Sequence, residues 1–159
     1  MIHVACVTLS AALPPAGVTI VTACNPEGED IGRTANSFSS VSLDPPMVLW
    51  SLAKTSIGQH DFHRAQHFAV HVLGEVQETL SGLFAGKAAD RFDGLSLTRG
   101  ADGIPVINGC AARFECRTVH RYDGRDHVIF VGEVLTVERA PRRPLLFHAG
   151  RYGRLQAAD

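Results

Sequence analysis

The sequence predicts a mainly β protein, an antiparallel barrel that is closed or partly closed, with a few short helices. Three observations favour this fold: most periodic segments are strand-like, they outnumber the helical segments, and strands and helices do not alternate regularly. With 159 residues, of which 45% are hydrophobic, the chain can bury one ordinary core. We therefore expect a single domain over residues 1–159.

Five segments have the composition or alternation of β-strands. The first is rich in Val, Ile and Thr, and it ends at the turn-forming residues 25–28. The last has apolar residues on both faces in its first half, so we expect it to be central in the sheet. The predicted strands are residues 17–24, 47–52, 67–73, 112–120 and 127–139.

The remaining segments are expected to be helices or connections. Residues 57–65 and 77–84 favour short helices, the second because its apolar residues have helical spacing. Residues 100–109 have the character of a surface connection, and residues 1–13 look more like a strand than a helix.

Small hydroxyl and amide residues crowd residues 33–46, which end in Pro45 and Pro46. Because two prolines prevent a helix from continuing, this segment is predicted to be a loop between two strands. Its small side chains would let a flat or phosphorylated ligand approach the backbone N–H groups. We therefore expect a binding loop here.

Composition argues against several classes of protein. The net charge of −1 offers no basic surface for nucleic acid. No apolar run is long enough for a membrane span, and the N-terminus lacks the basic region of a signal peptide, so we expect a cytoplasmic protein without a membrane partner. The cysteines lack metal-site spacing and are expected to be free thiols in strands; they are Cys6, Cys24, Cys110 and Cys116.

Residues 51–56 combine two serines, a threonine and a lysine directly after a predicted strand. Hydroxyl groups, backbone N–H groups and one cation can surround a phosphate. The alternative is that Thr55 or Ser56 caps the helix that follows.

Two further motifs leave alternatives open. Arg91 could bind a phosphate while Phe92 covers a planar ring, or the pair could be an exposed ion-pairing residue beside a core anchor. Asp126 could hold His127 in one tautomer, although such a pair is also common in turns.

Four histidines are spaced three, four and four residues apart, at His60, His63, His67 and His71, as metal ligands on one helix face would be. Residues 68–73 are strand-like, however, and this divides the set between two elements. We expect no metal site. The chain also lacks the G-x-G-x-x-G motif of a Rossmann dinucleotide site and the G-x-S-x-G elbow of a hydrolase.

Several short motifs, the most specific of them at residues 34–46, stand in an order that covers nearly the whole chain after Pro15. They are residues 17–22, 34–46, 68–73 with Gln77, 90–92, 126–127 and 150–153. In these motifs the chain resembles the short-chain flavin reductases with the FMN-binding split-barrel fold. These reductases supply reduced flavin to two-component monooxygenases.

The resemblance implies a role for each matching residue. It implies flavin contacts for Arg33, Thr34, Ala35, Asn36, Ser37, Ser39 and Ser40, with Arg91 and Phe92 near the flavin, and phosphate-side contacts for Ser51, Ala53, Lys54 and Ser56. It implies a catalytic position beside the nicotinamide for His127, with Arg151 and Tyr152 close by. Arg125 stands where the family usually has glycine, and it would add positive charge beside that pocket.

The function implied by the resemblance is reduction of FMN or FAD by NADH or NADPH. The reduced flavin would be released to a partner monooxygenase, and the family is typically homodimeric. Because the two nucleotides carry the chemistry, the protein would mainly stack and orient them. The alternatives are a flavoprotein that retains FMN as an electron carrier or binding module, and a metal-binding protein that uses the histidines.

Overall fold

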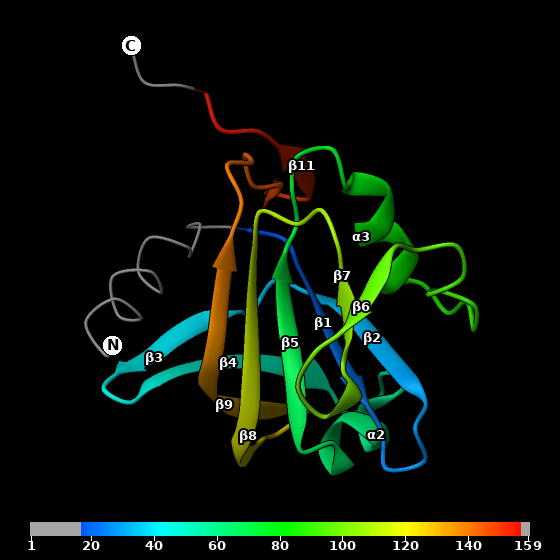
Figure 1. Ribbon diagram of the computed structural model, residues 1–159, viewed down its shortest axis with the longest axis vertical. Coiled ribbons are helices and arrows are strands. Elements are labelled where there is room, and N and C mark those ends of the chain that lie inside the picture. The colour runs from blue at the N-terminus through cyan, green and yellow to red at the C-terminus, as the bar shows by residue number, and fades with distance from the viewer. Residues whose placement is uncertain (1–16, 157–159) are drawn as a thin grey trace.

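The computed structural model describes residues 17–156, so the strand-like segment predicted at residues 1–13 lies outside the described residues. Its main element is a curved antiparallel sheet of seven strands (Figure 1). In order across the sheet they are β2 (Asp30–Ala35), β1 (Thr19–Cys24), β5 (His67–Val72), β8 (Ala112–Gly124), β9 (His127–Arg139), β4 (Pro46–Ala53) and β3 (Ser39–Leu43).

The sheet curls into a partly closed barrel because its two edge strands follow one another in the sequence. Strand β2 ends at Ala35 and β3 begins at Ser39, so four peptide units, about 14 Å at most, join opposite edges. The hydroxyl group of Ser37 accepts a hydrogen bond from the backbone N–H of Ser51 in β4, at 2.8 Å. The ladder of hydrogen bonds stays open between β2 and β3. This confirms the predicted mainly β, split-barrel architecture.

The core lies inside this curved sheet. Strand β9 is central, between β8 and β4, as its two-sided apolar pattern predicted. Trp50 of β4 stacks on Phe130 of β9 with ring centroids 4.9 Å apart, and it meets Phe62 edge-on at 5.0 Å. All three side chains are buried. These aromatic contacts join β4 to its neighbour β9 and to α2 within the core.

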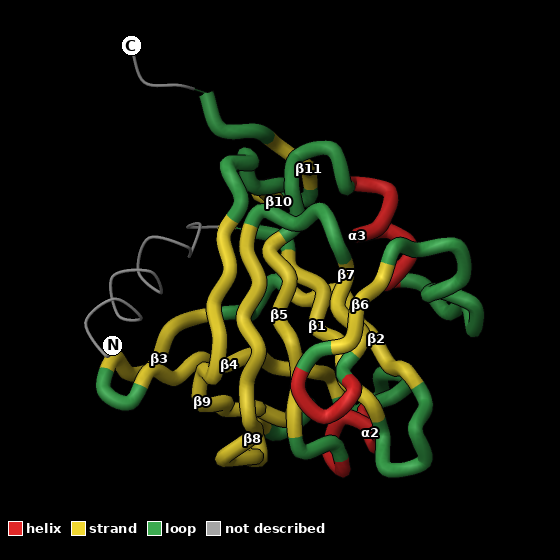
Figure 2. The backbone as a smooth tube through the Cα atoms, viewed as in Figure 1, coloured by secondary structure: helices red, strands yellow, loops and turns green. Residues whose placement is uncertain are grey.

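Short elements cover the β1–β2 side of the barrel (Figure 2). Both predicted helices are present, and α3 packs against β1 and β2. Within residues 17–156, no helix has the length and apolar character needed to cross a membrane. The short elements are α2 (Gln59–Arg64), α3 (Glu78–Ala85), β6 (Leu97–Arg99), a 3₁₀ turn (Ala101–Gly103), β7 (Pro105–Ile107), β10 (Leu146–His148) and β11 (Arg151–Gly153).

Two predicted connections are wrong. Residues 33–46 are not one loop: they contain the end of β2, a short crossing at 36–38 and the whole of β3. Strand β3 was missed because it is a mostly exposed edge strand of small residues, with no apolar alternation to mark it. Residues 100–109 include the buried strand β7, which was missed because it has only three residues and begins with proline.

The cysteines only partly follow their prediction. Cys24 lies in β1 and Cys116 is buried in β8, whereas Cys110 precedes β8 rather than lying in a strand. These three are free thiols, and Cys6 lies outside the described residues.

Candidate functional site

Strand β2 runs between two cavities. One, which we call the aromatic cavity, has a volume of about 260 Å³ and is lined by Val18, Thr34, Ala35, Asn36, Ser81, Ala85, Phe147 and Tyr152. The other, which we call the arginine cavity, has a volume of about 230 Å³ and is lined by Asp30, Ile31, Gly32, Ile57, Gly58, Asp61, Phe62, Lys87, Ala88, Ala89, Arg91 and Phe92.

The aromatic cavity is built around Ser81 of α3. The hydroxyl group of Thr34 donates to the backbone oxygen of Ser81 at 2.7 Å, which ties the end of β2 to the helix. The hydroxyl groups of Ser81 and Tyr152 share a hydrogen bond of 2.8 Å. Phe147 meets the ring of Tyr152 edge-on at 5.2 Å. Helix α3 and the β10–β11 hairpin, which are distant in the sequence, thus enclose a space beside Thr34, Ala35 and Asn36.

This arrangement brings together four residues that the sequence singled out, Thr34, Ala35, Asn36 and Tyr152. Sequence reasoning missed Ser81 and Phe147. Ser81 has no motif of its own, because a single serine inside a short helix gives no signal of a binding role. Phe147 lies five residues before Tyr152 in the sequence. The two residues become neighbours only because β10 and β11 pair in a hairpin, with Phe147 opposite Tyr152.

Arg33 occupies the middle of β2 and is buried, with 7% of its surface exposed. Its Nε donates to the backbone oxygen of Ile57 at 2.9 Å, and its Nη1 donates to that of Gly86 at 2.7 Å. Burial lowers the pKa of the guanidinium, and the nearby charge of Arg91 lowers it further. The residue therefore bridges the loop after β4 and the end of α3 as a desolvated cation.

Arg91, in the chain segment after α3, also contacts the backbone of Gly86. Its Nη1 donates to the backbone oxygen of Gly32 at 2.9 Å and its Nη2 to that of Gly86 at 2.8 Å. Its Nε is buried and has no hydrogen-bond partner among the described residues. Phe92 packs edge-on against Phe84, with ring centroids 5.1 Å apart. The pair thus places a cation and an aromatic ring on the wall of the arginine cavity.

The segment after β4 stands next to Arg33. The N–H of Lys54 donates to the backbone oxygen of Asp126 at 2.9 Å, and its ammonium group forms an ion pair with Asp123, whose pKa it lowers. The N–H of Ser56 closes a turn by donating to Ala53 at 2.9 Å. The helix-capping alternative for this segment is wrong, because Gly58 occupies the N-cap of α2 and no side chain caps the helix.

His127 begins β9 and lies opposite Ala53 in the ladder with β4. Its Nδ1 and the carboxylate of Asp126 are 2.9 Å apart, so the ring donates from Nδ1 and leaves Nε2 free to meet a ligand. The same hydrogen bond lowers the pKa of Asp126. The structure therefore groups His127 with Ala53 and Lys54, outside the lining of both cavities. Arg125, in the turn before it, has a φ of 70°.

The remaining predicted residues stand apart from both cavities. Ser39 and Ser40 are exposed on β3, where they pair with Leu49 and Val48. Arg151 is exposed on β11, opposite His148. Their side chains line neither cavity.

The four histidines do not form a cluster. His60 and His63 belong to α2, whereas His67 and His71 belong to β5, and within residues 17–156 no group of potential ligands is placed to hold a metal ion. His71 is fully buried, and its Nδ1 lies 3.0 Å from the backbone oxygen of Ile20. Its Nε2 accepts from the N–H of Ile107 at 3.1 Å, so the ring is neutral.

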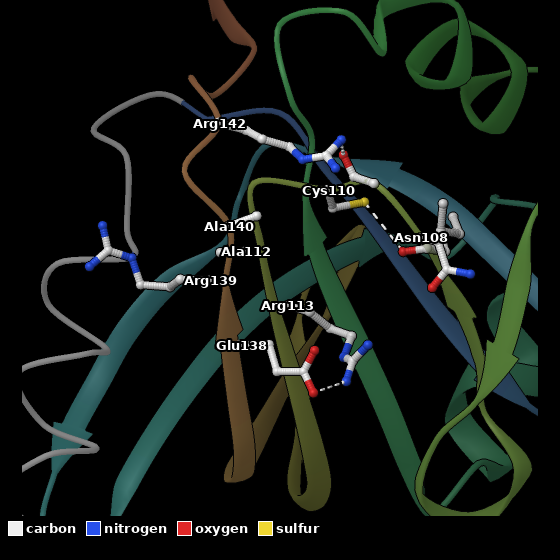
Figure 3. A pocket seen from close by; sticks show the side chains of 10 residues that line it. Asn108, Cys110, Ala112, Arg113, Glu138, Arg139, Ala140 and Arg142 are labelled. Carbon is white, nitrogen blue, oxygen red and sulfur yellow. Dashed lines mark hydrogen bonds and ion pairs between the residues drawn. The ribbon is translucent and has the colours of Figure 1, made fainter.

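A further cavity of about 160 Å³ lies at the far end of β8 and β9 (Figure 3). Arg142 donates to the backbone oxygen of Gly109 on its rim at 2.9 Å. Arg113 on the cavity wall pairs with Glu138 at 2.7 Å and with Glu115 at 3.2 Å, so the charge of this arginine is neutralised within the protein. None of the predicted site residues lines it.

Comparison with known proteins agrees with this architecture. Residues 12–156 match the model of the flavin reductase like domain. The chain is 51% identical to an FMN reductase (NADH) of Agrobacterium fabrum over 140 residues, which cover 87% of this chain and 78% of the relative. It is 43% identical to the reductase component of the flavin-dependent trigonelline monooxygenase of Acinetobacter baylyi, over 86% of this chain but only 44% of that protein.

A solved structure of a relative has a similar fold. The NADH:FAD oxidoreductase of Streptomyces globisporus, in complex with NAD and FAD fragments, superposes with a TM-score of 0.83 at 39% identity, covering 94% of this chain and 91% of the other. The protein therefore belongs to the flavin reductase like family.

Proposed function

We propose that this protein is an NADH-dependent flavin reductase, which reduces FMN or FAD and supplies the reduced flavin to a partner monooxygenase. The observation that carries the proposal is the position of Thr34, Ala35 and Asn36, which line the aromatic cavity at the end of β2 next to the buried cation Arg33. An apolar space beside polar backbone and a cation suits a ring system that carries a phosphate. The names of the relatives agree with this reaction.

The residues of the chain fit a flavin. When both are bound, the nicotinamide supplies the hydride and the flavin accepts it. Because β2 is an edge strand, alternate N–H groups along it are not paired with β1, and those near Thr34 to Ser37 can donate to negative charge on a ligand. Phe147 and Tyr152 add aromatic rings to the wall of the same space. The protein thus contributes orientation and electrostatic stabilisation.

His127 is proposed to lie beside the nicotinamide. Asp126 holds its Nδ1–H, so the imidazole presents Nε2 in one orientation. Lys54, which is tied to the backbone of Asp126 in the same corner, is proposed to hold a phosphate together with Ser51, Ala53 and Ser56. These assignments predict that His127→Ala raises the KM for NADH, whereas Lys54→Ala raises the KM for the flavin.

Steady-state kinetics tests the proposed reaction. The purified protein is given NADH or NADPH with excess FMN or FAD, and oxidation is followed by the loss of nicotinamide absorbance. We expect NADH oxidation that saturates with free flavin. A flavin that stays bound through gel filtration, with no turnover of added flavin, would contradict release and favour an electron carrier.

Homodimer formation is part of the proposal. Val41 and Leu43 of the edge strand β3 are 50% and 48% exposed, and Leu135 of β9 is 46% exposed. An open strand edge with large apolar side chains favours association with another chain. Light scattering after gel filtration should give twice the mass of the chain, and Leu43→Asp should shift it toward the monomer.

The proposed monooxygenase partner rests on relatives that are named reductase components or subunits. A cytoplasmic location is proposed because the three free thiols of the described residues suit a reducing compartment. If the partner exists, an oxygenase supplied with the reductase, NADH and catalytic flavin should hydroxylate its substrate, whereas the reductase alone should not.

A further inference from the structure

We propose that one end of the barrel is a docking surface for an acidic face of the partner oxygenase. We call this end the basic end and define it as residues 74–77 and 139–155. That the partner is an oxygenase rests on the proposed function. The docking surface itself is argued from the charges and the exposed side chains of this chain.

The net charge of −1 conceals an uneven distribution of charge along the chain. Residues 139–156 contain five arginines and no aspartate or glutamate, whereas residues 17–138 contain ten Lys and Arg against fifteen Asp and Glu. Within the described residues, none of these five arginines forms an ion pair. The five are Arg139, Arg142, Arg143, Arg151 and Arg154.

Backbone contacts gather these arginines at one end of the barrel, where the loop after β9 lies beside the β10–β11 hairpin (Figure 1). Pro144 bridges Gly74, close to the end of β5, and the N–H of Glu75 donates to the backbone oxygen of Arg143 at 2.9 Å. All five arginines are exposed, and Glu75 is the single acid in the sequence of the basic end. The basic end therefore carries net positive charge, while the other described residues carry net negative charge.

Large apolar side chains lie exposed at the same end. Val76 is 80% exposed, Leu155 is 45% exposed and Tyr152 is 38% exposed. Arginine and tyrosine are enriched in protein–protein interfaces, in which apolar side chains become buried inside a polar rim. A protein partner would use both the charges and the apolar side chains, whereas a small anion would leave the apolar side chains in water.

The charge of the basic end decides which protein fits it. Opposite potentials attract across an interface, so the facing surface of the partner is acidic. A second copy of this chain would place five arginines against five more, and the proposed homodimer contact uses the residues of β3 and Leu135 instead. A nucleic acid or an anionic membrane would be repelled by the acids that surround the basic end.

The position of the basic end suits the delivery of flavin. Phe147 and Tyr152 belong to it and also line the aromatic cavity, where the proposed function places the flavin ring. Arg151 and Arg154 stand on either side of Tyr152 in the sequence. A partner docked here would lie beside that cavity, so the reduced flavin would travel only a short distance.

Fluorescence anisotropy with a synthetic peptide tests the docking surface. The probe is a fluorescein-labelled peptide of glutamates interspersed with tryptophans, and we expect it to bind with an affinity that falls as salt is added. Arg143→Glu should weaken binding about tenfold, and adding Arg154→Glu should weaken it further, because attractive contacts become repulsive. Arg125→Glu is the matched control, since it makes the same change of charge at the opposite end of β9 and should leave the affinity unchanged.

Several outcomes would overturn the proposal. One is unchanged affinity in Arg143→Glu/Arg154→Glu, and another is equal binding of the peptide with glutamine in place of glutamate. Polyuridylate or phosphatidylserine vesicles bound more tightly than the peptide would assign the basic end to a nucleic acid or a membrane. A fall of the double variant to the monomer mass in gel filtration would assign it to a second copy of this chain.

NADH oxidation with free flavin separates this inference from the proposed function. The double variant should keep the wild-type kcat and KM for flavin, since neither Arg143 nor Arg154 lines a described cavity, yet yield less hydroxylated product per NADH oxidised in the assay with an oxygenase. A raised KM for free flavin would mean that these arginines attract the flavin itself, against the proposal. Flavin reduction without peptide binding would overturn the docking surface and keep the proposed function. Peptide binding that depends on Arg143, without flavin reduction, would do the reverse.

Discussion

Arg33 and Arg91 donate hydrogen bonds to the same backbone oxygen, that of Gly86, at 2.7 and 2.8 Å. Two cations that converge on one acceptor repel each other, which contributes to the lowered pKa of Arg33. They also join β2, the end of α3 and the following segment at a single point. Because the same two arginines hold these segments together and supply positive charge, the stability of the contacts at Gly86 and the affinity of Arg33 and Arg91 for an anion are linked.

Replacing Arg91 with lysine tests this link. A lysine keeps the charge but cannot bridge Gly32 and Gly86 with a planar fork, so we expect a loss of about 1–3 kcal/mol in the free energy of unfolding. The KM for flavin should rise as well. Urea denaturation measures the first effect, with Arg143→Lys as the control. Equal stability of both variants would show that the bridge contributes nothing.

Gly32 is predicted to tolerate no side chain. A Cβ atom there would lie 2.6 Å from Cε1 of Phe84 and 2.9 Å from Cζ of Phe92. We expect Gly32→Ala to destabilise the protein by about 1–3 kcal/mol through overpacking. It should also weaken flavin binding, because the backbone oxygen of Gly32 holds Arg91.

Gly82→Ala is the matched control for this change. Gly82 is exposed in α3 and a Cβ atom there meets nothing within 4 Å, so alanine should stabilise the helix by about 0.5–1 kcal/mol. Thermal denaturation of both variants should therefore give shifts of opposite sign. If Gly32→Ala unfolds at the wild-type temperature, Phe84 and Phe92 must be free to move away.

The sequence predicted the architecture well because the central strands have apolar patterns that are typical of buried β-strands. The apolar pattern of residues 127–139 indicated a central strand, and β9 has the same bounds. Strand β3 could not be found in this way, since an edge strand with exposed serines needs no apolar face. The short strand β7 is buried on all three residues and depends on contacts with distant segments, among them the hydrogen bond from Thr22 to Pro105 at 2.6 Å.

The part of the candidate site that the sequence singled out is mostly one contiguous segment, with Tyr152 added from the resemblance. Thr34, Ala35 and Asn36 line one cavity because they are neighbours in the chain, at the end of β2 and the residue after it. Ser81 joins them through the packing of α3 on β2, which no local pattern reveals. The buried state of Arg33 was equally hidden, because an arginine among small polar residues resembles a surface residue until the loop after β4 closes over it.

His71 predicts a pH dependence of stability. Burial, the largest effect, lowers the pKa of His71, the hydrogen bond to Ile20 raises it and the charge of Arg113 lowers it; together they bring it from 6.5 to about 4. The unfolded chain therefore takes up a proton first as the pH falls. The stabilising contribution is complete above about pH 6.5 and is lost progressively as the pH falls from 6.5 to 4. A shift of this size corresponds to roughly 3 kcal/mol.

Urea unfolding at a series of pH values checks this expectation. Other acidic groups also titrate in the range, so the comparison is between the wild type and His71→Gln, in which the titrating ring is absent. The wild type should lose more stability than the variant between neutral pH and pH 4. Parallel curves would mean that the ring is protonated in the folded protein, against its contact with the N–H of Ile107.

The hydrogen bond between Ser81 and Tyr152 is predicted to hold the wall of the aromatic cavity in place. Ser81 is buried, with 1% exposed, so Tyr152→Phe leaves its hydroxyl group without this partner at a cost of about 1–2 kcal/mol. Tyr122→Phe is the control, since Tyr122 is 51% exposed and none of its described contacts uses the hydroxyl group.

A double-mutant cycle with Ser81→Ala separates this bond from general effects on packing. The two single changes should each destabilise the protein, while the double variant should lose about 1 kcal/mol less than their sum because both remove the same interaction. The KM for flavin should follow the same non-additive pattern if the bond positions the aromatic wall. Strictly additive losses would show that Tyr152 lines the cavity without being held by Ser81.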